Sequence, residues 1–127
     1  MTPEETKALA EKIWRRCGFY QKTNPSGFHY WRKDTDGNYD WARPYLPPLT
    51  HDNFWKWAVP KLQEKGLEGI EFGWEKGESV CVLVFEIATS DSLGSIFATG
   101  LDPDPALAAF KAIENLIDQE VTDDVEA

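Results

Sequence analysis

Cysteine and histidine are scarce in this chain of 127 residues, and long apolar runs are absent. Two cysteines, Cys17 and Cys81, and two histidines are too few for a disulfide scaffold or a self-contained zinc site. No apolar run approaches the roughly 20 residues that a membrane-spanning helix needs. The acidic start, Met-Thr-Pro-Glu-Glu, is unlike a signal peptide. We therefore expect a cytoplasmic protein with no membrane partner.

Motifs for catalysis and metal binding are also missing. The sequence has no nucleophile elbow, phosphate-binding loop or dinucleotide fingerprint. Asp34, Asp36 and Gly37 suggest a calcium loop, but EF-hand spacing would then place Arg32 and Arg43 where carboxylates are required. We expect no catalytic residue, no metal site, no cofactor and no enzymatic activity.

The whole chain has a formal net charge of −9, and basic residues are rare in its second half. Residues 1–66 have eleven basic and eight acidic residues, whereas residues 67–127 have two basic and fourteen acidic residues. Such an anionic surface repels nucleic acid and attracts basic protein surfaces. The alternative explanation is that the acids simply keep a small domain soluble. Several acids crowd the end of the chain, so we expect residues 120–127 to form a frayed acidic tail.

Apolar residues make up 42% of the chain, which is enough for one domain that we expect to span residues 1–119. Thr2 followed by Pro3 and Glu5 predicts a helix over about 3–17. Apolar spacing predicts further helices from Thr50 to Gly66 and from about 104 onwards. Pro60 lies inside the second helix and predicts a kink or a break there.

The stretch between the last two helices predicts three strands joined by short turns, an antiparallel meander. Apolar residues alternate over 70–75, which indicates one buried and one wet face. Residues 80–87 are apolar on both faces, so we expect a central strand covered on both sides, with Cys81 buried and unreactive. Val82→Asp should then unfold the domain. The predicted fold class is α/β: a three-layer α/β/α sandwich with an aromatic loop or small hairpin inserted.

Residues 19–45 form the aromatic part of the chain, with eight of its 17 aromatic residues interleaved with four cations. Proteins that bind single-stranded nucleic acid stack bases on such rings, but three aspartates leave this segment a net charge of only +1. We therefore expect no direct nucleic-acid binding. A small core that covers a helix face is the structural alternative, and an exposed patch for a protein partner is the functional one. The candidate contacts are Tyr30, Trp31, Arg32, Tyr39, Trp41 and Arg43.

Three blocks of sequence, in this order, are similar to a known family. They are the acidic opening helix from Thr2, the run Pro48-Leu49-Thr50-His51-Asp52 before a Trp-containing helix, and Ala98-Thr99 followed by an Asp/Pro linker and an Ala-rich helix. In these blocks the chain resembles the phage ABA-sandwich domain family, small proteins of bacterial viruses and prophages. The resemblance implies the three-layer fold and a location in the host cytoplasm. It implies no catalytic residues, and Pro60 departs from the pattern.

The acidic half and the phage resemblance together favour a binding protein whose partner has a basic surface. Inhibition of a host nucleic-acid-binding defence enzyme, of the anti-restriction or anti-CRISPR type, is the sharpest form of this hypothesis. One alternative is a ligand-binding or enzymatic domain that uses the aromatic loop and His51. Another is assembly through homo-oligomers, and we expect a monomer or a homodimer. The predicted acidic ridge consists of Glu68, Glu71, Glu75 and Glu78.

Overall fold

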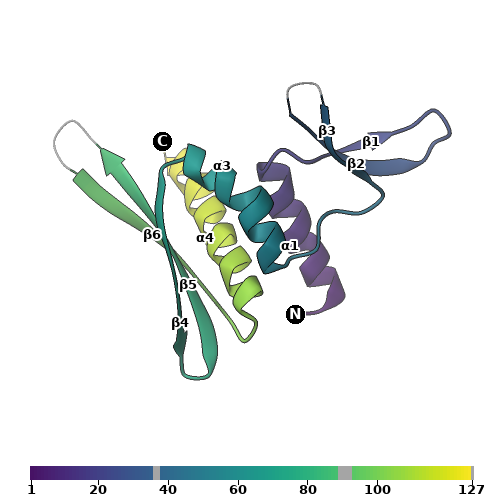
Figure 1. Cartoon of the computed structure of the whole chain (residues 1–127). Helices are drawn as coiled ribbons and strands as arrows, with labels where there is room; N and C mark the ends of the chain where they lie inside the picture. Colours follow the sequence, from purple (N-terminus) through teal and green to yellow (C-terminus); the bar gives the residue numbers. More distant parts are fainter. Residues whose placement is uncertain (36–37, 89–92, 127) are drawn as a thin grey trace. The chain divides into compact units, whose positions relative to one another are not determined.

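The computed structural model describes residues 1–35, 38–88 and 93–126, and it divides the chain into two compact units. The first unit is Met1–Pro48 and the second is Leu49–Ala127. Each has helical structure and a three-stranded antiparallel sheet, which confirms the mixed α/β class (Figure 1). The sequence indicated no boundary at Pro48, and the assignment of both units to one domain stays a prediction.

Helix α1, Pro3–Arg16, opens the first unit as predicted. The Glu5 N–H donates to the Thr2 hydroxyl at 3.1 Å, and the same hydroxyl lies 3.1 Å from the Glu5 carboxylate. The first contact satisfies one of the backbone donors that a helix N-terminus otherwise leaves free, and in the second the hydroxyl donates to the carboxylate. The helix ends at Arg16 with Cys17 as its C-cap, and Gly18 follows with a φ of 101°, a left-handed conformation that glycine adopts without strain.

The aromatic segment is a complete sheet rather than a loop or a single hairpin. Strands β1, Tyr20–Thr23, β2, His29–Thr35, and β3, Asn38–Arg43, pair in the order β1-β2-β3. The sequence suggested the β2–β3 hairpin but missed β1. The turn before β2 is held by the Asn24 side-chain oxygen, which accepts from the N–H groups of Ser26 and Phe28.

The second unit begins with a helical segment that accommodates Pro60 by changing its helix type. It consists of α2, His51–Asn53, the π-helical η1, Phe54–Ala58, and α3, Val59–Glu64. The Val59 N–H donates to the carbonyl of Phe54, five residues back, and Pro60 follows in the first turn of α3. Pro60 has no N–H to donate to the preceding turn, and the helical hydrogen-bond pattern changes in the π turn directly ahead of it. The helical segment is continuous from His51 to Glu64, so of the predicted kink or break the break is not seen, and a π turn precedes Pro60 instead.

A second meander follows, formed by β4, Leu67–Glu75, β5, Glu78–Ala88, and β6, Leu93–Asp102. The order β4-β5-β6 confirms β5 as the central strand. Helix α4, Pro105–Glu126, closes the unit. The helix continues through residues 120–126, and fraying of this predicted tail stays a prediction.

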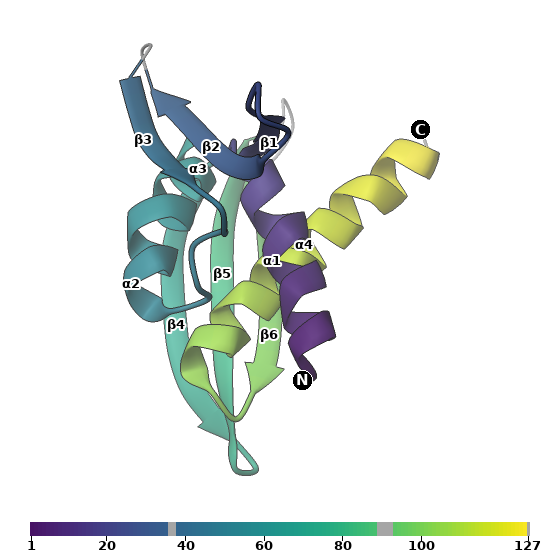
Figure 2. The same cartoon turned by 90° about the vertical axis from the view of Figure 1, so that its right-hand side faces the viewer.

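Within the second unit, both helical segments contact the same face of the sheet (Figures 1 and 2). Phe72 of β4 pairs with Cys81, which pairs with Gly100, so these three residues share a face. Phe72 lies against Phe54 of η1, and Gly100 lies against the backbone of α4. The helices on both faces that a three-layer sandwich requires are therefore not confirmed.

The opposite face of β4-β5-β6, here called the open face, is apolar but incompletely buried. Val80, Val82 and Val84 are half-buried, and Phe97 and Leu101 of β6 are 57% and 43% exposed. The sequence pattern predicted complete cover here because valine is as apolar as the residues of a core. A strand that is apolar on both faces can be buried on both, but the sequence pattern does not show that the unit has a helix layer to pack on each face.

Polar contacts fix α4 at the end of β6. The Ala106 N–H donates to the Asp104 carboxylate at 2.8 Å, so Asp104 caps the helix. Asp102 instead accepts from the Asp104 N–H at 2.9 Å and from Lys111 Nζ at 2.6 Å. Burial alone would raise the pKa of Asp102, but these two hydrogen bonds hold it below its ordinary value.

Candidate protein-binding surface

Three of the four predicted acidic residues lie together on the open face. Glu71 pairs with Val82, so it shares the face of the half-buried valines. Glu75 lies two pleats further along the same face, directly opposite Glu78 across the hairpin. Glu68 lies at the β-bulge between Leu67 and Gly69 and has no cross-strand partner. All four side chains are exposed.

A hollow of about 300 Å³ lies next to these acids. It is lined by the consecutive β4 residues from Glu71 to Glu75 and by Val80 and Val82 of β5. Because consecutive residues of a strand point to opposite faces, a hollow that touches all five lies along the β4 edge as well as on the open face. The surface therefore combines an apolar floor with a carboxylate rim.

The pairing of Glu75 with Glu78 is unfavourable for the isolated protein. Like charges directly opposite each other across a strand pair are destabilising. Lys76 lies in the turn between them, but in the described part of the chain it forms no ion pair with either glutamate. The fold thus offers no internal reason for this arrangement. A cation supplied from outside would relieve the repulsion.

The six candidate contacts of the aromatic segment are divided between two faces of the first sheet. Trp31, Trp41 and Arg43 share one face, on which Trp31 is 7% exposed. Arg15 of α1 stacks over Trp31 at 4.8 Å, and Arg43 stacks over Trp41 at 5.2 Å. Trp31 is therefore buried beside α1, as the structural alternative of a small core that covers a helix face expected, whereas Trp41 is half-buried.

The opposite face of the first sheet displays Tyr30 and Arg32, and it is polar. Asp34 accepts from Arg32 Nε and from the Tyr20 hydroxyl, both at 2.6 Å. The guanidinium and the hydroxyl hold the pKa of Asp34 below its ordinary value, and the bond to Asp34 raises the pKa of Tyr20. This Arg32 charge is already paired, which weakens the face as a cation site for nucleic acid. The side chain of Tyr39 lies outside the described residues.

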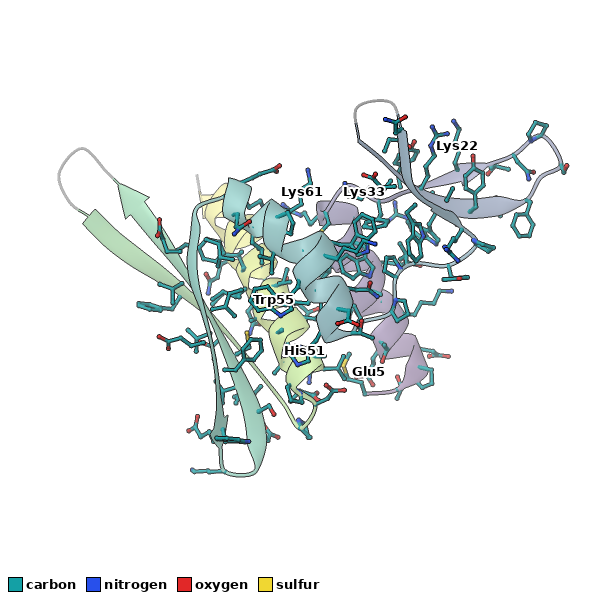
Figure 3. The ribbon with its side chains drawn as sticks, viewed as in Figure 1. Glu5, Lys22, Lys33, His51, Trp55 and Lys61 are labelled. Atoms are coloured by element: carbon teal, nitrogen blue, oxygen red, sulfur yellow. The ribbon has the colours of Figure 1, made fainter. Side chains whose placement is uncertain are left out.

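The residues tested for catalysis and metal binding are dispersed. His51 begins α2 (Figure 3). Its ring lies 5.5 Å from the ring of Phe72, an apolar neighbour that cannot exchange a proton. Cys17 and Cys81 are both buried and form no disulfide, and burial raises the pKa of the Cys81 thiol to about 11. The unreactivity of Cys81 stays a prediction. Among the described residues no three potential metal ligands cluster, and Asp36 and Gly37 of the suggested calcium loop lie outside them.

The sequence missed two exposed aromatic residues at the far end of β4. Phe72 and Trp74 were expected on a buried face, but they are 44% and 87% exposed. The strand itself was predicted, but its burial does not alternate, because no residue of β4 is buried and the last five are all exposed. Their closeness to the Lys76-Gly77 turn could have indicated this exposure, because a hairpin tip commonly extends past the layer that packs on the sheet.

Comparisons with other proteins add no relative. No family model matches the chain, and no curated protein or solved structure matches it either. The resemblance to the phage ABA-sandwich family therefore stays a prediction. Among the described residues, no helix combines the length and apolar character needed to cross a membrane.

Proposed function

We propose that this protein is an acidic binding module that engages a basic surface on a protein partner through β4 and β5. The observation that supports this most strongly is the placement of Glu71, Glu75 and Glu78 beside an apolar hollow, with two of the carboxylates opposite each other. Complementary charge speeds association, and an apolar floor slows dissociation once water is excluded. A cytoplasmic location and the inhibition of a host nucleic-acid-binding enzyme belong to this proposal.

The charge of the second unit supports the same conclusion. It has five basic and sixteen acidic residues, against eight and six in the first unit. A partner that normally binds phosphates would present cations to such a surface. A partner layer on the open face would also complete the three-layer sandwich that the sequence suggested.

The two alternatives lack a comparable observation. A ligand or substrate pocket made from the aromatic residues would have to draw on both faces of the first sheet. Homo-oligomers through the acidic surface would bring two units of net charge −11 together. Both alternatives remain hypotheses.

The test is a pull-down from bacterial lysate with three baits: the wild type, Glu71→Lys/Glu75→Lys, and Asp123→Lys/Asp124→Lys. The last bait is the control, because it changes the net charge equally in the predicted acidic tail. We expect the wild type and the tail control to retain the same protein at low salt, and the β4 variant to lose it. Raising the salt to about 1 M should release it, because the Debye length falls to about 3 Å. Equal capture by all three baits would contradict the proposal.

A further inference from the structure

The outer edge of β4 has unpaired backbone groups. A two-residue turn, Lys76-Gly77, joins β4 to β5, and both residues have positive φ, 52° and 84°. In such a hairpin the flanking pair, Glu75 and Glu78, exchanges both backbone hydrogen bonds, and bonded pairs then recur at every second residue. The N–H and C=O groups of Phe72 and Trp74 therefore point away from β5. In the described part of the chain, no strand and no side chain pairs with them.

The other edge of the same sheet is partly satisfied from within. Val82 of β5 uses its backbone N–H and C=O to bond with Glu71 of β4, so it does not bond with Thr99, its neighbour in β6. The N–H and C=O of Thr99 therefore point outward, away from β5. The side-chain amide of Asn115, from α4, donates to the Thr99 carbonyl. Edge strands are usually protected in such ways. Of the two edges, β4 is the one that is left available.

The two faces of β4 offer different chemistry to a strand laid beside it. Glu71 and Glu75 lie on the open face, whereas Phe72 and Trp74 lie on the other. A neighbouring strand alternates its side chains with the same period. A partner strand complementary to β4 would therefore place lysine or arginine opposite the carboxylates and apolar residues opposite the rings.

We infer that β4 binds an extended segment of a partner by strand addition, and that this segment alternates basic with apolar residues. The inference rests on the proposed function and specifies the binding mode. A second copy of β4 fits poorly, because the strand contains Glu68, Glu71 and Glu75 and no basic residue. Two copies would align six carboxylates along one seam, whereas a basic strand neutralises them.

The experiment measures the affinity of labelled synthetic peptides by fluorescence anisotropy. The first peptide alternates lysine and valine over nine residues, the length of β4. A block peptide has the same composition with all lysines first, and a third peptide is the alternating one with N-methyl groups on every second amide. Trp74→Pro removes an outward N–H, and Trp74→Ala removes the ring but keeps that N–H, so it sets the reference affinity.

Strand addition predicts that the alternating peptide binds more tightly than the block peptide and that N-methylation abolishes this advantage. Trp74→Pro should weaken binding about tenfold relative to Trp74→Ala, the effect of about one lost hydrogen bond. If Trp74→Pro does not fold, the comparison with the N-methylated peptide alone tests strand addition.

Equal binding of the alternating, block and methylated peptides would overturn strand addition. If Glu71→Lys/Glu75→Lys still weakens all three, the proposed function survives. If that variant binds them as the wild type does, the proposed function fails as well.

Discussion

The two sheets of this protein have the same topology, but the charges of the first are paired whereas those of the second are of one sign and clustered. Both are three-stranded antiparallel meanders in sequence order. In the first, Arg15 and Arg43 stack on tryptophan rings, and Arg32 pairs with Asp34. In the second, Glu71, Glu75 and Glu78 gather on one face, and two of them are directly opposite each other. Charges that neutralise one another stabilise a fold locally, whereas charges of one sign on one face remain available to a partner.

The largest effect on stability should come from placing a charge on the buried face of β5. Leu83 is 0% exposed and faces the helices, so Leu83→Asp buries a charge with no partner and should unfold the second unit. Val82 is half-buried on the open face, so the expectation that Val82→Asp unfolds the domain is revised. We now expect it to cost about 1 kcal/mol, through lost apolar contact and repulsion from Glu71. Urea unfolding followed by circular dichroism measures both, and equal losses would show that both faces are core.

Two glycines on the two faces provide the next comparison. A Cβ at Gly100 would overlap the α4 backbone at Ala108 and Ala112, whereas a Cβ at Gly73 would meet no atom within 4 Å. Gly100→Ala should therefore cost about 3 kcal/mol or more, because backbone must move. Gly73→Ala should leave stability nearly unchanged or slightly raised. Thermal unfolding of the two variants makes the measurement, and a harmless Gly100→Ala would mean that α4 is not seated on β6.

The part-buried ion pair between Asp102 and Lys111 should make the stability of the second unit depend on pH. Asp102 has a lowered pKa in the folded state, so its contribution is complete above its ordinary value of 3.8 and is lost as the pH falls through the folded value. Asp102→Asn should cost about 1 to 3 kcal/mol at pH 7, because Lys111 loses its carboxylate. The difference from wild type should shrink in acid below pH 3.8. Lys111→Met should follow the same pH course, and a difference that is constant with pH would exclude Asp102 as its source.

Much of this architecture could be predicted from local sequence, and the failures have a common cause. Helix caps and turns were predictable because the groups involved lie within four residues of one another, as at Thr2 and Thr50. The central position of β5 followed from its double apolar face. Cover of that face and the exposure of Trp74 depend on where distant segments pack, which periodicity does not encode. The acidic face was predictable in part, because Glu71 and Glu75 alternate in register, but the opposition of Glu75 and Glu78 required the pairing itself.

The smallest effect should come from the polar face of the first sheet, whose charges are already paired. Asp34→Asn removes the carboxylate that accepts from Arg32 and Tyr20, at a half-buried site where screening by water keeps the effect on stability slight. The pKa of Tyr20 should nevertheless fall back toward its ordinary value of 10.0, because the bond to Asp34 is the main cause of its rise. Titration of the Tyr20 ring by NMR follows this directly. Asp40→Asn removes the same charge elsewhere in the sheet and should leave Tyr20 unchanged. If Asp40→Asn has the same effect as Asp34→Asn, the net charge of the sheet controls Tyr20, and the local pairing that distinguishes the first sheet from the second is wrong.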